Sequence, residues 1–214
     1  MKVNTIFLSS RRGFTLIELL TVLAIMAILL GLVGPSLIQN LQGSSLTRAA
    51  AMVQSTLKTA HQYALSHQNT VQVRFYQIPQ TTGTYTALQI IEVTPQISNT
   101  GTASYTYVPL SQVINLPGQI TMLNTAQYST ILTLLGSPAG TATAPVAGTD
   151  PNIPLYGQNY SYQEVGFLPN GGTDLPNTTQ LYYVTVAAPL PATPVNFCTI
   201  LVDPVTGKVT SYRP

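Results

Sequence analysis

The sequence predicts an α+β protein, in which one long N-terminal α-helix packs on an antiparallel β-sheet domain. Three observations predict this class. The first is an apolar run from Phe14 to Val33, and the second is an amphipathic pattern that continues the run to about Ser66. The third is a series of short alternating segments, separated by Gly and Pro, in the remainder of the chain.

The predicted helix has an apolar first half and an amphipathic second half. Segment 14–34 is long enough to cross the hydrocarbon core of a bilayer, which takes about 20 residues. Segment 35–66 is expected to lie against a globular domain, since its apolar side chains recur at helical spacing. Pro35 is expected to kink or loosen the helix between the two halves. The apolar positions of the second half are Leu37, Leu41, Leu46, Ala49, Val53, Leu57, Ala60 and Ala64.

Residues 67–214 have the pattern of a β-rich globular domain. Thr70–Tyr76 alternates apolar and polar side chains, as a half-buried strand does. The stretch 137–154 is rich in Gly, Pro, Ala and Thr, and we expect an exposed loop there. Further strands are expected at 85–93, within 116–123, at the start of 165–172, and at 181–187, 197–202 and 209–212, with turns at 80–83 and 203–208.

Charge is sparse and unevenly placed. Charged residues make up 7% of the 214 residues, and the chain is rich in Tyr, Val, Ile and Leu, so it is not a disordered composition. Three of the eight basic residues, Lys2, Arg11 and Arg12, precede the apolar run. By the positive-inside rule they hold the N-terminus in the cytoplasm, and the rest of the chain is translocated. Without segment 1–13, acidic residues slightly outnumber basic ones, which argues against nucleic acid as a partner.

One carboxylate lies inside the apolar run, just after the junction with the basic segment. A charged side chain in lipid costs at least ~2.5–3.5 kcal/mol on insertion scales, so a partner is expected for Glu18. If the chain were cut after Gly13, Phe14 would carry a new amino group, and Glu18 would lie one helical turn further on. The amine and the carboxylate could then neutralise each other, within one chain or between neighbouring chains.

The stretch Arg11-Arg12-Gly13-Phe14-Thr15-Leu16-Ile17-Glu18-Leu19-Leu20 resembles the class III signal of type IV pilins and type II secretion pseudopilins. The resemblance implies that a prepilin peptidase removes the basic leader 1–13 between Gly13 and Phe14 and methylates the Phe14 amine. It also implies that Glu18 assists assembly into a helical filament. Other pilin or pseudopilin subunits and an inner-membrane assembly platform are the further partners that the resemblance implies.

Later segments resemble the H-type minor pseudopilins and their type IV pilus relatives. These segments are 49–75, 116–118, 167–171 and 205–209. The resemblance implies a pilin-like fold and the role of a minor pseudopilin or minor pilin. Such a subunit is anchored in the bacterial inner membrane as a single-pass protein, with its globular domain in the periplasm, before it is assembled into a pseudopilus or pilus. Two alternatives remain open, a major pilin and a DNA-binding minor pilin for DNA uptake.

The sequence holds no constellation typical of an enzyme, so we expect no catalysis, no cofactor and no metal. His61 and His67 are six residues apart on the predicted helix and lack a companion Cys or His pair. Cys198 lies in a predicted strand and is expected to act as a small buried hydrophobe. The aspartates of the globular part are expected to form turns through their side chains, and they are Asp150, Asp174 and Asp203.

Lys208 and Arg213 are the only basic residues in the C-terminal half. They are the candidate contacts for the DNA-binding alternative, because some H-type pilus relatives bind DNA through basic C-terminal segments. Two cations neutralise few phosphates, and non-specific DNA binding needs several. The pair therefore gives that alternative weak support.

Overall fold

The computed structural model describes residues 14–77, 84–97, 103–133, 160–188, 194 and 196–213. The chain divides into two compact units, Met1–Leu41 and Gln42–Pro214, which are treated separately below. The predicted leader 1–13, the turn at 80–83 and the loop 137–154 lie outside the described residues.

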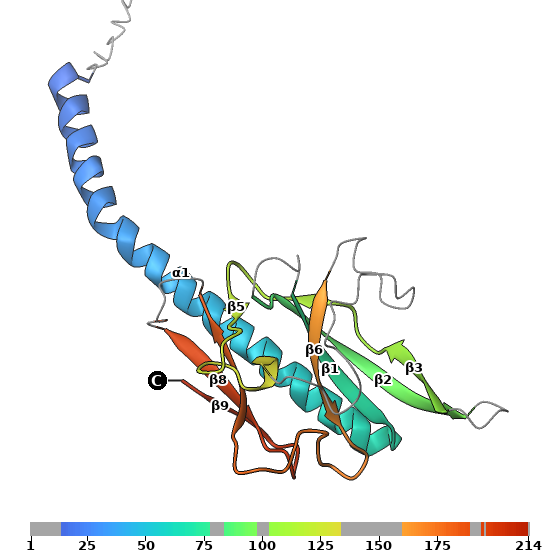
Figure 1. Ribbon diagram of the computed structural model, residues 1–214. Helices are drawn as coiled ribbons and strands as arrows, with labels where there is room; N and C mark the ends of the chain where they lie inside the picture. Colours follow the sequence, from blue (N-terminus) through green and yellow to red (C-terminus); the bar gives the residue numbers. More distant parts are fainter. Residues whose placement is uncertain are drawn as a thin grey trace, which may run out of the picture. The chain divides into compact units, whose positions relative to one another are not determined.

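One helix precedes all the strands (Figure 1). Helix α1 runs from Leu16 to His67, as the sequence pattern predicts to within two residues at each end. The strands are β1 (Thr70–Gln77), β2 (Ala87–Ile97), β3 (Ala103–Pro109), β4 (Ile114–Asn115), β5 (Thr121–Met122), β6 (Ser161–Phe167), β7 (Tyr182–Ala187), β8 (Phe197–Val202) and β9 (Val209–Tyr212), and the short 3-10 helix η2 (Ile131–Thr133) follows β5.

The strands form two antiparallel sheets. Sheet A has the order β3-β2-β1-β6, with β4 paired to the end of β2, and sheet B has the order β5-β7-β8-β9. The sequence pattern did not predict two sheets, nor did it predict β3. In β3 Ala103, Tyr105 and Tyr107 alternate with Ser104 and Thr106, a signal that was not recognised. Residues 104–106 are exposed and lie at the edge of sheet A.

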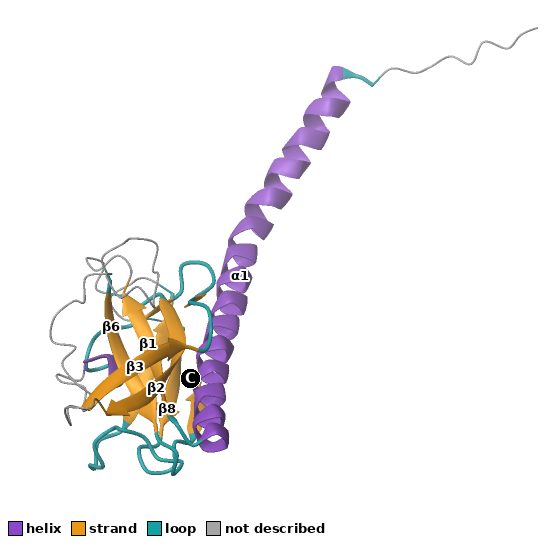
Figure 2. Cartoon of the chain, turned by 90° about the vertical axis from the view of Figure 1, so that its right-hand side faces the viewer, coloured by secondary structure: helices purple, strands orange, loops and turns teal. Residues whose placement is uncertain are grey.

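The second half of α1 supplies one side of a core that both sheets share. Its buried side chains recur every three or four residues, and Leu57 is fully buried. The inner faces of the sheets meet this stripe through residues such as Val73 of sheet A and Ile200 of sheet B. Figure 2 shows the strands gathered along this part of α1. The α1 residues in this core are Leu46, Ala49, Val53, Leu57, Ala60 and Ala64, all predicted from the periodicity.

The 203–207 turn docks sheet B against α1. The side-chain oxygen Oδ1 of Asp203 accepts hydrogen bonds from the backbone N–H of Val205 at 2.9 Å and of Thr206 at 3.1 Å. These two bonds hold the pKa of the Asp203 carboxyl below its ordinary value, and the bond from Thr206 has the larger effect. Asp203 thus forms the predicted turn. Gly207 closes it with φ of 63°, and a Cβ there would lie 2.6 Å from the carbonyl oxygen of Gly171.

The role of Asp174 differs from the prediction. Its carboxylate accepts a hydrogen bond from the backbone N–H of Gly166, eight residues earlier, at 2.7 Å. It therefore bridges a loop to a strand instead of shaping a local turn. Asp150 lies outside the described residues.

Replacing Leu57 by Asp should destabilise the folded domain by several kcal/mol, because an unpaired carboxylate would enter the shared core. Thr59→Asp is the matched control, since Thr59 is exposed two residues further along α1 and the charge change is the same. Thermal melts of the mature chain in detergent, followed by circular dichroism, measure the difference. Equal melting temperatures for the two variants would contradict the assignment of this stripe to the core.

Gly207→Ala should cost at least about 3 kcal/mol of folding free energy, from its positive φ and from steric overlap. The overlap is with the Gly171 carbonyl oxygen and with Nε2 of His61, which would lie 2.8 Å from the new Cβ. Gly118→Ala separates the two causes. Gly118 has almost the same φ, 64°, but its nearest neighbour is 3.8 Å away, so about 1 kcal/mol is expected. Denaturant titration of both variants tests the order, and equal losses would refute the close contact.

Candidate processing and assembly site

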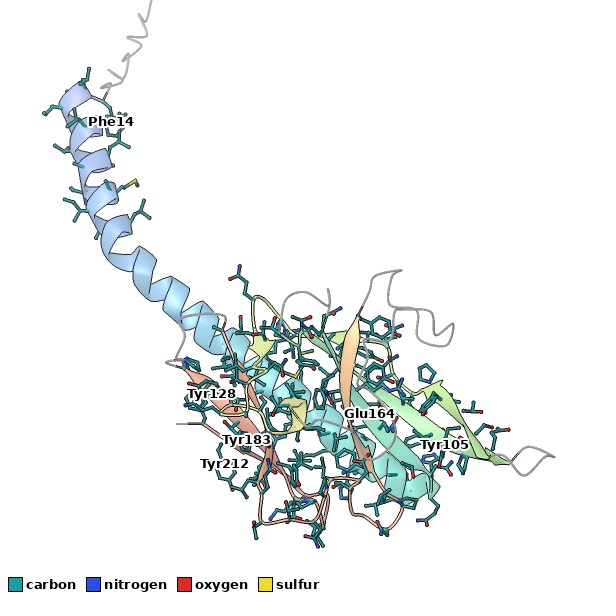
Figure 3. The ribbon with its side chains drawn as sticks, in the orientation of Figure 1. Phe14, Tyr105, Tyr128, Glu164, Tyr183 and Tyr212 are labelled. Carbon is teal, nitrogen blue, oxygen red and sulfur yellow. The ribbon has the colours of Figure 1, made fainter. Side chains whose placement is uncertain are left out.

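Phe14 and Thr15 precede the first turn of α1, and Thr15 caps the helix. The side chain of Phe14 is 83% exposed (Figure 3). The backbone N–H of Glu18 donates to Oγ1 of Thr15 at 3.3 Å, which satisfies one of the amides that a helix start leaves unpaired. The sequence analysis did not identify this cap. The pattern Thr15-x-x-Glu18, with a glutamate three residues after the cap, was the available signal.

Glu18 is exposed and lies in the first turn of α1. A negative side chain is favourable there, because the helix dipole places partial positive charge at the N-terminus. The structure thus places Phe14 and Glu18 at the same helix start, as predicted, while Gly13 lies outside the described residues. The neutralisation of a Phe14 amine by the Glu18 carboxylate stays a prediction.

The first turns of α1 present large apolar side chains to solvent. Glu18 is the one charged residue between Phe14 and Gly31. An exposed apolar surface of this extent marks a site of association. The exposed side chains are Phe14, Leu16, Ile17, Leu19, Leu20, Val22, Leu23, Ile25, Met26, Ile28, Leu29 and Leu30.

Two further observations concern α1. Among the residues that the structure describes, no helical segment combines the length and the apolar character that a membrane crossing requires. Pro35 falls within the bounds of α1, and its side chain is not described, so the kink at Pro35 stays a prediction.

The two candidate DNA contacts have different surroundings. Lys208 is exposed beside the 203–207 turn. Arg213 donates from Nη1 to Oγ1 of Thr47 at 2.7 Å and from Nη2 to Oδ1 of Asn196 at 3.2 Å. Arg213 therefore ties the end of the chain to α1, a role that the sequence did not indicate. Contact of either residue with DNA stays a prediction.

The remaining candidates have structural surroundings. Nε2 of His61 donates to the carbonyl oxygen of Gly171 at 3.0 Å, and the ring of His67 stacks on Tyr63. Cys198 is buried on β8, as predicted. Within the described part of the chain, no three or more His, Cys, Asp or Glu side chains come close enough to hold a metal ion.

Comparison with known proteins identifies the N-terminal segment. Residues 8–34 match the prokaryotic N-terminal methylation motif. No curated protein matches the chain. Among solved structures, the chain is similar to the type IV minor pilin FimU of Pseudomonas aeruginosa strain PAO1, at 11% sequence identity and a TM-score of 0.46. That similarity covers 80% of this chain and 93% of the FimU chain.

The matched motif spans the predicted cleavage junction, Phe14, Glu18 and the apolar start of α1. The observed architecture is a long N-terminal helix followed by antiparallel sheets. The chain therefore carries a prokaryotic N-terminal methylation motif at the start of a long helix that is followed by antiparallel sheets.

Proposed function

We propose that the chain is a minor pilin or minor pseudopilin, a structural subunit of a type IV pilus or of a type II secretion pseudopilus. The observation that carries this proposal is the coincidence of the methylation motif with an exposed, apolar helix start. A subunit that is cut and methylated at Phe14 gains an N-terminus that continues directly into this apolar helix. The same helix can then serve first as a membrane anchor and later as a filament-core element.

Before assembly, the apolar run holds the subunit in the bacterial inner membrane as a single-pass protein. The run continues in the sequence to Val33, and the basic leader keeps the N-terminus in the cytoplasm. The domain 42–214 then lies in the periplasm. A prepilin peptidase cleaves after Gly13, and the inner-membrane assembly platform moves the subunit into the filament.

In the filament, the exposed side chains of α1 pack against the same helices of neighbouring subunits. Each Leu or Ile that becomes buried contributes about 1.5–3 kcal/mol. Glu18 would be costly in that apolar core without a partner. The methylated Phe14 amine of an adjacent subunit supplies the opposite charge. Both groups lie at the helix start, so the amine and the Glu18 carboxylate would lie at a similar depth in the filament core.

The structure lends no specific support to DNA uptake. Of the two candidate contacts, Arg213 already bonds to Thr47 and Asn196, and its guanidinium would have to leave them to reach a phosphate. A major pilin shares every feature described above, and abundance in sheared filaments distinguishes it from a minor subunit.

The mature N-terminus should be an N-methylated Phe14. Intact-mass measurement of the protein from membranes, in cells with and without the prepilin peptidase, checks this directly. We expect loss of residues 1–13 and a gain of one methyl group only when the peptidase is present. Retention of Met1, or cleavage at any other bond, would contradict the proposed processing.

Glu18→Ala should leave membrane insertion intact but reduce incorporation into filaments at least tenfold, because the Phe14 amine loses its partner. Thr21→Ala is the matched control, since it removes an exposed polar group three residues further along α1 without changing charge. The measurement is the ratio of subunit in sheared filaments to subunit in membranes. Normal incorporation of the Glu18 variant would exclude this role for the carboxylate.

A further inference from the structure

A single turn, residues 168–175, links sheet A, sheet B and α1. Its own backbone is closed by a hydrogen bond from Leu168 N–H to the carbonyl oxygen of Gly172 at 2.9 Å. Gly171 accepts the hydrogen bond of His61 from α1. Thr173 donates from both its N–H and its hydroxyl to the carbonyl oxygen of Pro204, next to sheet B, each at 3.0 Å. The 168–175 turn is therefore shared by three elements that are distant in sequence.

Asp174 attaches this turn to the edge of sheet A. Its backbone N–H donates to the carbonyl oxygen of Gly166 at 2.9 Å, and its carboxylate oxygen Oδ1 accepts from the Gly166 N–H at 2.7 Å. The carboxylate also packs directly on Gly166, where an added Cβ would lie 2.5 Å from Oδ2. Only glycine at position 166 leaves room for it.

A second carboxylate, Glu164, lies on the same face of β6, two residues before Gly166. Glu164 forms an ion pair with Arg74, in which Oε2 of Glu164 accepts a hydrogen bond from Nε of Arg74 at 3.0 Å. Both side chains are only 4% exposed. The guanidinium is also held between the rings of Tyr107 and Tyr162, at 4.6 and 4.4 Å from their centres. Figure 3 labels Glu164 on this sheet. Arg74 is thus committed to Glu164.

The surroundings of Asp174 favour its neutral form. Burial raises the pKa of its carboxyl to about 6, the hydrogen bond from Gly166 opposes this, and the charge of Glu164 adds to it. The other ionisable groups on the elements packed around the turn are Arg74 of β1, His61 of α1, and Asp203 and Lys208 of the neighbouring turn. None of these four acts appreciably on the Asp174 carboxyl.

We propose that Asp174 is a proton-operated latch, which holds the 168–175 turn on β6 more tightly when it is protonated than when it is ionised. In the released turn the carboxyl is in water and ionises at its ordinary pKa of 3.8. Ionisation therefore favours the open form, and the latch is strongest in acid and weakens as the pH rises from about 4 to about 6. With a pKa of 3.8 in the open turn and about 6 in the closed turn, the ratio of open to closed turns should rise roughly tenfold between about pH 5 and about pH 7.5.

Opening would loosen one end of the domain without unfolding it. The bonds that depend on the turn are those of His61 with Gly171 and of Thr173 with Pro204, at the C-terminal end of α1. The paired strands of sheet B, such as β7 and β8, keep their own hydrogen bonds. This inference concerns the folded domain and does not depend on which filament uses the subunit.

Hydrogen exchange of the mature chain in detergent, corrected for the intrinsic pH dependence of amide exchange, tests the latch. Protection of the amides of Gly166, Leu168 and Thr173 should fall roughly tenfold from about pH 5 to about pH 7.5. Protection of the β7 and β8 amides should stay constant. A wild-type protein whose 168–175 protection does not change over this range would overturn the proposal.

Two variants assign the effect to one carboxylate. Asp174→Asn keeps the acceptor for the Gly166 N–H but cannot ionise, so its protection should be high and the same at both pH values. Asp203→Asn, a change of the same kind in the adjacent turn, should keep the full tenfold dependence. Persistence of the pH dependence in Asp174→Asn, or its loss in Asp203→Asn, would overturn the assignment to Asp174.

If Asp174→Asn fails to fold, a carboxyl-carbon NMR titration of the wild type decides. A midpoint for Asp174 near 6 supports the latch, and one near 4 overturns it.

Discussion

The burial of one stripe of α1 by two separate sheets is the constraint on which the folded domain depends. Side chains on this stripe are fully or almost fully buried, and three of them are alanines. Small side chains let both sheets approach the helix axis closely, while Leu46, Val53 and Leu57 fill the space between the sheets. Within the described residues, the pairing between the sheets is limited to an isolated bridge of Tyr85, just before β2, with Met122 of β5. The mutual placement of the sheets therefore depends largely on α1 and on the turns that connect them to it.

The sequence predicted those parts of the fold in which local pattern and burial agree. The helical stripe and β8 have clear periodicity because each buries one face. Strand β1 was found from its alternation, but the prediction that it is half-buried was wrong, because both of its faces are covered from Val71 to Gln77. The division into two sheets could not be predicted, since it depends on which strands pair across long stretches of chain. Strand β3 was not predicted, because its alternating side chains are tyrosines on an exposed edge strand and not a strongly apolar face. Asp174 was misassigned for a similar reason, as its partner Gly166 is determined by tertiary contact.

The candidate processing site is proposed from linear order alone. A segment that a peptidase cleaves is recognised by the order of its residues, so the proposed roles of Gly13, Phe14 and Glu18 rest on their spacing within the matched motif. The capping role of Thr15 adds a purely local reason for a small hydroxyl at the helix start. The contact of Arg213 with Thr47 could not be predicted from linear order, because the partner lies 166 positions away in the sequence.

The bond between Arg213 and Thr47 also closes the domain into a ring without a covalent link. All the described strands lie between these residues, so the last strand of sheet B and the beginning of the buried stripe are joined by a side chain instead of by the backbone. A chain end held in this way does not fray independently of the helix it touches. Tension applied along α1 would consequently reach β9 directly, and the terminal strand would share the load with the strands that precede it.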